Sequence, residues 1–484
     1  MSEAICGDPT VAYRFIETEL RGADFGDARL ASRLVRVGGM LARSPGCGLP
    51  DCIGDDSQLE CTYRFLSNSR VTPDRMLEPH ERQTYQRIAM RSEALAVHDT
   101  TELEFGGERE GLGPLSRGTR RGFFMHVTLA VAADASRQAL GVVTHRFWVR
   151  SDKPRRKLKD RRLNGQASSR RPYRESRRWA EQVEQVEARK TPGLSLIHVG
   201  DRETDAFEML EAVHSLRFVL RANHDRRVFD EGESTRLREA CQRADVSTTF
   251  QVDVSPRKAR KQPGAAKSFP ARDARVALVA VRGLSVSIRE PYKRDGQQLP
   301  VNVVHARETK PPDGAEPIDW LLYTSEPIDT PAQLQRVIDI YRARWVVEEF
   351  FKALKTGCEV QSLQLETYEA LRNAVALHLP IAWQILLLRS AAREHPHGPA
   401  HQVLTSTQLD VLRTFSRRPL SAHPSVYEAM LAIAMLGGYL ITKATRPPGW
   451  ITLGRGMQRL MDYEQGWIAA LSAAKPPEKV PLEH

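Results

Sequence analysis

The sequence has few cysteines, and none of them follows a spacing that marks a metal or redox site. Its six cysteines form no C-x-x-C pair. Cys47, Cys52 and Cys61 are close in sequence, but no fourth ligand that would complete a zinc site stands nearby. We therefore expect free thiols in a reducing compartment.

Long apolar runs and a targeting segment are also lacking. The most apolar stretches, 379–388 and 429–441, are shorter than the ~20 residues that cross a bilayer, so we expect two buried core helices. The N-terminus has no basic start followed by an apolar run, and we expect no signal peptide. These absences favour a cytoplasmic protein with no membrane contact.

Several motifs of common enzymes are missing. There is no G-x-x-x-x-G-K-[ST], so nothing supports an ATP-driven mechanism, and neither H-E-x-x-H nor G-x-S-x-G occurs. His395, His397 and His401 lie close together among prolines and a glycine, which favours a surface loop over a metal site.

Positive charge, by contrast, is plentiful. The 484 residues carry a net charge of +11 with 41% hydrophobic residues, which indicates a folded protein of two to four domains. Such a charge favours a polyanionic partner, although many basic proteins bind none. Residues 152–179 hold twelve Lys/Arg against three Asp/Glu and few apolar residues. We expect a loop there that becomes ordered only on a partner.

Residues 27–43 have the period of an amphipathic helix with Asp27 as its N-cap. Leucine and valine form one stripe, and Arg29, Arg33 and Arg36 lie on a second stripe about 100° away. A solvated arginine face explains this pattern, and so does a helix lying against a phosphate backbone. The helix alone does not decide between them.

The middle of the chain alternates predicted strands and helices, which indicates an α/β fold. A stretch at 224–318 interrupts the alternation and is predicted to be a mostly β insertion, and the chain after 360 is predicted to be helical. Strands are expected at 94–105, 123–134, 139–150, 194–201, 216–222 and 318–328, and helices at 176–190, 203–215 and 330–357.

Two aspartates end predicted strands, Asp99 in "LAVHD" and Asp201 in "LIHVGD", and Glu348 lies in the long helix 330–357. Carboxylates at strand ends can converge at one edge of an α/β sheet, where they suit Mg²⁺ or Mn²⁺. Two such ions can promote phosphodiester cleavage. An aspartate after a strand is also a common helix cap or turn residue, and among 60 Asp and Glu such a set is easy to find.

Four unlike side chains recur every few residues in the helix: Tyr341, Arg344, Glu348 and Lys355. Residues with this spacing share one face of a helix. Arg344 and Lys355 can hold phosphate oxygens beside a metal bound by Glu348, and Tyr341 can donate one more hydrogen bond. An exposed face with Arg344–Glu348 pairing is the alternative, contributing only ~0.3–0.5 kcal/mol.

Tyr-(2)-Arg-(3)-Glu-(6)-Lys at 341–355 resembles the signature of the insertion-sequence-four family of bacterial transposases. Further similarity covers nearly the whole chain. It includes "DTT" at Asp99, "DRETD" at Asp201, "WLLYTSEP" at Trp320, "GDARLASRLVRVGGMLA" and "YRFLSN" near the N-terminus, and "LAIAMLGGYL" near the C-terminus.

The resemblance implies an RNase H-like catalytic core with a β insertion, flanked by helical domains. The expected domains are a transposon-end DNA-binding domain at 1–75, the core at 76–372 with its insertion at 224–318, and a dimerisation domain at 373–484. It also implies a cytoplasmic, nucleoid-associated bacterial protein. This protein would bind double-stranded transposon ends and target DNA as a homodimer.

The resemblance further implies cut-and-paste transposition through a DNA hairpin. Asp99, Asp201 and Glu348 become the catalytic and metal-binding triad, holding two Mg²⁺ ions for which Mn²⁺ can substitute. Trp320 becomes the platform for a flipped base, although a tryptophan in a strand is usually a core residue. Tyr341, Arg344 and Lys355 become DNA contacts, as do Arg29, Arg33 and Arg36.

Two features depart from the family pattern: Phe123-Phe124 stands where a tryptophan pair is expected, and 152–179 is unusually basic. Two other classes of protein remain as alternatives. One is a non-catalytic DNA-binding relative or inhibitor, against which the intact triad and N-terminal region argue. The other is a stand-alone nuclease on the same fold.

Overall fold

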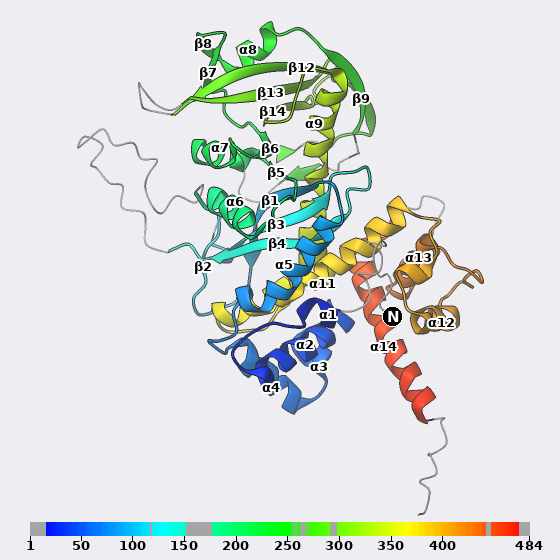
Figure 1. Cartoon of the computed structure of the whole chain (residues 1–484). Helices are drawn as coiled ribbons and strands as arrows, with labels where there is room; N and C mark the ends of the chain where they lie inside the picture. The colour runs from blue at the N-terminus through cyan, green and yellow to red at the C-terminus, as the bar shows by residue number, and fades with distance from the viewer. Residues whose placement is uncertain are drawn as a thin grey trace, which may run out of the picture. The chain divides into compact units, whose positions relative to one another are not determined.

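The structure is a computed structural model that describes residues 16–116, 119–151, 177–254, 256, 259–261, 268–269, 271–290, 298–441 and 447–473. The chain divides into two compact units (Figure 1). One comprises residues 91–104 and 113–347, which we call the sheet unit; the other comprises 1–90, 105–112 and 348–484, which we call the helical unit. Of the basic segment 152–179, residues 152–176 lie outside the described residues, and residues 177–179 begin a helix.

The sheet unit is built on one mixed sheet of twelve strands among the described residues. Its order is β2-β3-β1-β5-β6-β14-β13-β12-β7-β8, with β4 beside β3 and β9 beside β12. The strands are β1 (Ala94–Glu104), β2 (Gly113–Pro114), β3 (Arg121–Ala132), β4 (Ala139–Trp148), β5 (Leu196–Gly200), β6 (Arg217–Arg221), β7 (Arg227–Asp230), β8 (Glu233–Arg236), β9 (Thr248–Val254), β12 (Arg275–Arg289), β13 (Gln298–Glu308) and β14 (Asp319–Thr324). A separate two-stranded ladder joins β10 (Arg260–Lys261) and β11 (Ser268–Phe269).

The first half of this sheet has the pattern that the sequence predicts. β1 pairs antiparallel with β3, and β3 with β4, forming the expected hairpin. On its other side β1 pairs parallel with β5, and β5 pairs parallel with β6. Every residue of β5 is buried, as is typical of a central parallel strand covered on both faces. This mixed α/β arrangement is compatible with an RNase H-like core.

Residues between β6 and β14 form the predicted β-rich region. β12 and β13 make a long antiparallel pair, and β14 lies antiparallel between β13 and β6. The strands of this region therefore extend the central sheet. The boundaries of the three predicted domains stay a prediction.

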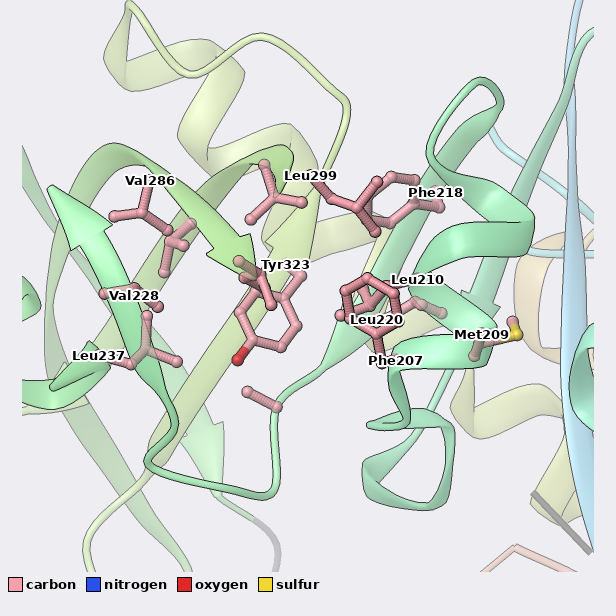
Figure 2. Packing of buried hydrophobic residues seen from close by; sticks show 14 of the residues in the cluster. Phe207, Met209, Leu210, Phe218, Leu220, Val228, Leu237, Val286, Leu299 and Tyr323 are labelled. Atoms are coloured by element: carbon pink, nitrogen blue, oxygen red, sulfur yellow. The ribbon is translucent and has the colours of Figure 1, made fainter. Parts of the chain in front are cut away.

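Helices cover both faces of the sheet unit: α6 (Arg177–Arg189), α7 (Phe207–Val213), α8 (Leu237–Arg243) and α9 (Pro331–Ala343). α6 and α7 pack together on one side, and α9 packs on the other, against strands that include β5 and β6 (Figure 1). Apolar side chains from α7, β6 and the β-rich region form one core around Tyr323 (Figure 2). This core joins the β-rich strands to the parallel half of the sheet.

The helical unit contains α1 (Ile16–Leu20), α2 (Ala28–Arg43), α3 (Leu49–Ile53), α4 (Asp56–Leu66), α5 (Pro73–Ala89), α11 (Tyr368–Glu394), α12 (Ser406–Phe415), α13 (Val426–Leu436) and α14 (Trp450–Ala473), with short 3-10 turns at Val360–Ser362 and Ala400–Gln402. Among the described residues α11 alone has the length and apolar composition of a membrane span, but 83% of its apolar window is buried. The stretches 379–388 and 429–441 lie in or overlap α11 and α13, so the prediction of core helices is confirmed.

Two further local predictions are confirmed. Asp27 caps α2 by accepting a hydrogen bond from the Arg29 backbone N–H at 2.9 Å, as predicted. The described cysteines, from Cys47 to Cys358, are all free thiols, also as predicted.

The expected strand 94–105 is confirmed as β1, but Asp99 lies inside the strand and not at its end, because β1 stays paired with β3 after its pairing with β5 has ended. One expected element differs from the structure. The expected helix 330–357 is divided into α9, α10 (Trp345–Lys352) and a π-helical turn at Ala353–Gly357. Hydrogen bonds from residue i to i+3 tighten the chain around Arg344, and the Cys358 backbone N–H reaches back to the Ala353 carbonyl.

Candidate active site

Asp99 and Asp201 come together through the register of two parallel strands. Val97 of β1 is the partner of Val199 of β5, and each aspartate follows its valine by two residues. Because side chains alternate along a strand, both aspartates project from the same face, beside each other at the carboxyl end of the pairing. Both are half-buried. The Asp201 carboxylate also caps the 3-10 turn Arg202–Thr204, accepting from the Glu203 backbone N–H at 2.8 Å.

The same edge carries Arg221, which sequence reasoning missed. Gly200 of β5 is the partner of Leu220 of β6, so Arg221 stands next to Asp201 in register. Its guanidinium donates to the Tyr341 hydroxyl at 3.1 Å and to the Asp319 carbonyl at 3.0 Å. Its place in the sequence could have indicated this residue, because Arg221 stands at the end of the predicted strand 216–222, as Asp201 stands at the end of the predicted strand 194–201.

Two residues of the predicted helix face join this edge. Tyr341 is 6% exposed, and its ring lies edge-to-face with Trp320 at 6.0 Å. The Arg344 guanidinium donates to the Asp99 carboxylate at 3.3 Å, with the two side chains only 10% and 14% exposed. The alternative, an exposed helix face, would leave Tyr341 and Arg344 open to solvent. Their burial therefore favours a functional site.

Trp320 is half-buried on β14 and is not part of the closed core. The residue before it, Asp319, accepts hydrogen bonds from His305 at 2.9 Å and from Arg238 at 2.8 Å. The His305 bond is the main cause that holds the pKa of Asp319 well below its ordinary value, and Arg238 acts in the same direction. Asp319 is thus a fixed anion that anchors this end of β14.

Glu348 and Lys355 belong to the helical unit. Glu348 is half-buried in the first turn of α10, four residues after Arg344, and Lys355 is half-buried in the π-helical turn. Within the described ranges, no three or more His, Cys, Asp or Glu side chains are gathered in a way that would hold a metal ion. The donor set itself suits Mg²⁺, because Asp99 and Asp201 supply hard carboxylate oxygens from adjacent strands.

The three arginines of α2 have different surroundings. Arg29 is 92% exposed and forms an ion pair with Asp27 at 3.2 Å. Arg33 and Arg36 both donate to the Gln58 side-chain oxygen on α4, at 2.9 and 3.4 Å. The three arginines form a basic, solvent-accessible face on α2, as the sequence predicted.

A surface pocket of about 610 Å³ lies at the opposite edge of the sheet, where β5 and β6 begin. Its cations are paired with carboxylates: Lys190 with Glu187, and Arg217 with Glu326 and Glu93. This pocket therefore offers no uncompensated positive charge for a phosphate, unlike the edge that carries Arg221.

Comparison with protein families matches two regions of the chain. A family described as transposase DNA-binding matches residues 12–71, which contain the α2 arginines. A family described as transposase DDE domain matches residues 164–383, which contain Asp201, Arg221 and Glu348, while Asp99 lies between the two matched ranges. The chain therefore carries a transposase DNA-binding domain followed by a transposase DDE domain, and together they support a DDE transposase that binds DNA.

Proposed function

We propose that this protein is a metal-dependent cut-and-paste DNA transposase of the insertion-sequence-four family with an RNase H-like core. The observation that carries the proposal is the edge of the sheet at which Asp99, Asp201 and Arg221 stand side by side in register. Carboxylates for divalent ions and a cation for phosphate are the groups that phosphodiester chemistry needs.

Asp99, Asp201 and Glu348 would hold the ions, two Mg²⁺ per site or Mn²⁺ in their place. The ions would activate the attacking oxygen and stabilise the leaving one. DDE transposase domains generally use divalent metals, and the match to that family supports this assignment.

The remaining residues act on the DNA. Arg221 and Arg344 bind phosphate oxygens, and Lys355 adds a third cation. The Tyr341 hydroxyl, which accepts from Arg221, is oriented to donate its own proton to a further oxygen. Trp320 stacks on a base that leaves the duplex, which permits a hairpin at the transposon end. The same residues then hold the cut end for its transfer into target DNA.

Two further parts of the chain extend the proposal. The basic face of α2 binds the transposon end through its phosphates. The helices α12–α14 serve the homodimer, because they expose Phe415, Tyr463, Ile468 and Leu471 to 44%, 38%, 50% and 56%. Apolar groups of this kind are favoured at protein interfaces.

Excision of a marked element from a plasmid tests this function, with the inverted repeats that flank the gene as ends. We expect Mg²⁺-dependent excision with hairpin-capped products and insertion elsewhere. Cleavage of any DNA without regard to the ends would indicate a stand-alone nuclease. Binding to the ends without cleavage in Mg²⁺ or Mn²⁺ would indicate a non-catalytic relative.

A further inference from the structure

Two buried histidines connect the strands that carry the aspartates. His98 of β1 and His198 of β5 are fully buried, and their rings stack at 5.2 Å with an angle of 14°. The His98 Nε2 and His198 Nδ1 atoms are 2.9 Å apart. His98 directly precedes Asp99, so its side chain lies on the opposite face of β1. The contact therefore lies directly behind the candidate site.

The hydrogen bonds around this pair form one continuous chain. Glu187 as a carboxylate only accepts, so His198 donates to it from Nε2, across 3.1 Å. The His198 Nδ1 and the His98 Nε2 share the next hydrogen bond, and the His98 Nδ1 shares another with the Thr128 hydroxyl at 2.9 Å. Burial, and then the neighbouring His198 and His126, hold the pKa of His98 well below its ordinary value, in keeping with a neutral ring.

The chain of bonds fixes four elements to one another. Glu187 belongs to α6 and Thr128 to β3, while the two imidazoles join β1 to β5. The other paired residues of β1 and β5, such as Val97 and Val199, are apolar apart from His198 itself. Apolar contacts are not directional, whereas a hydrogen bond weakens steeply with distance and angle. The imidazole pair is thus the side-chain contact that resists a shift of β1 along β5.

We propose that His98 and His198 are positioning residues that fix the separation of the Asp99 and Asp201 carboxylates. The inference rests on the proposed metal-dependent function, since that separation matters for an ion held by both aspartates. Residues that orient metal ligands typically change metal affinity or activity by about 10- to 100-fold when they are replaced.

The test is Mn²⁺ binding to the purified full-length protein without DNA, measured by calorimetry and by electron paramagnetic resonance. His98→Leu combined with His198→Leu removes both partners of the bond, which leaves no new unpaired imidazole. In this variant Glu187 still has its ion pair with Lys190, and Thr128 still has its hydrogen bond with Thr144. We expect a folded variant whose Mn²⁺ affinity is about 10- to 100-fold lower, and whose cleavage rate recovers at high Mn²⁺.

A matched pair of polar variants provides a second test if the leucine variant melts early. His98→Asn keeps a polar partner for Thr128 but is too short to reach His198, whereas His98→Gln keeps a polar group near the original Nε2. The asparagine variant should lose Mn²⁺ affinity and the glutamine variant should regain most of it. The control is His378→Leu: His378 is a buried histidine of α11 that bonds to the Ala374 carbonyl at 2.7 Å, and its variant should bind Mn²⁺ normally.

Asp99→Asn separates the two possible failures. If it lowers Mn²⁺ binding but the folded histidine variants bind as the wild type does, the positioning role is wrong and the metal site stands. If Asp99→Asn also leaves Mn²⁺ binding unchanged, the proposed metal site itself is wrong, and the positioning role is wrong with it.

Discussion

The arginines of α2 and those at the edge of the sheet offer the same charge in opposite settings. On α2, Arg29 is 92% exposed, and Arg33 and Arg36 share an uncharged partner, Gln58. At the sheet edge, Arg344 is 9% exposed and donates to the Asp99 carboxylate, and Arg221 donates to Tyr341.

These two settings indicate two different roles for the arginines. A solvent-accessible guanidinium is screened by salt, so it adds affinity for a polyanion without fixing a geometry. A guanidinium that is held by hydrogen bonds within the protein, as Arg344 is by Asp99 and Arg221 by Tyr341, is oriented before the ligand arrives. We therefore expect α2 variants to change DNA binding and sheet-edge variants to change the chemical step.

The largest effect should come from the carboxylates themselves. Asp99→Asn, Asp201→Asn and Glu348→Gln should each reduce cleavage to background while end binding persists, because the amides keep the shape but weaken metal binding. Cleavage of a labelled end substrate in Mg²⁺, beside a gel-shift measurement, checks both. Glu349→Gln is the matched control, since Glu349 forms an ion pair with Arg393 at 3.6 Å. Normal cleavage by a folded triad variant would remove that residue from the site.

Loss of one of the cations proposed to bind phosphate should have the next largest effect. Arg221→Ala, Arg344→Ala and Lys355→Ala each remove a charge-assisted phosphate contact of roughly 1.5–3 kcal/mol, which corresponds to a fall of about 10- to 150-fold in cleavage. Tyr341→Phe removes one hydroxyl and should be mildest. Single-turnover rates on a pre-cut end measure this. Arg342→Ala, which loses an ion pair with Asp339, should cleave normally. If Arg221 and Arg344 variants cleave at wild-type rates under sub-saturating DNA, the contrast between the two sets of arginines fails.

Trp320→Ala should separate two steps at the same site, first-strand nicking and hairpin formation. Loss of base stacking costs ~1–3 kcal/mol, so hairpin formation should slow roughly 5- to 150-fold. Nicking of the first strand comes before the flipped base is needed and should be spared. Separate quantification of nicked and hairpin products on denaturing gels tests this. Equal losses in both steps, or a large drop in melting temperature, would instead indicate a structural tryptophan.

The smallest effects should come from α2. Arg33→Ala and Arg36→Ala should weaken DNA binding similarly for different sequences, and each should lower the log–log salt slope by ~0.9 if it neutralises one phosphate. Titrations at several salt concentrations measure the slope. Arg43→Ala, at the end of the same helix and paired with Glu17 at 3.7 Å, serves as a control of equal charge change. An unchanged slope for Arg33→Ala and Arg36→Ala would mean a solvated face.

The sequence by itself determined the elements whose causes are local. The α2 helix begins after Asp27 as predicted, since a cap and a hydrophobic period depend only on neighbouring residues. The strands at β1, β3, β4, β5 and β6 followed from apolar runs and turn residues in the same way. The resemblance supplied the triad and the helix-face residues, and of these the structure brings Asp99, Asp201, Arg344 and Tyr341 to one edge.

Only the tertiary structure decided what depends on partners far away in sequence. The pairing of β1 with β3 on one side and with β5 on the other was decided in this way, because no local pattern encodes which strand is the partner. The break at Arg344 goes with an ion pair to a residue 245 positions away. The register of β1, β5 and β6 decides the roles proposed for Arg221 and for the pair His98–His198. A shift by one residue would turn each of these side chains to the other face of the sheet.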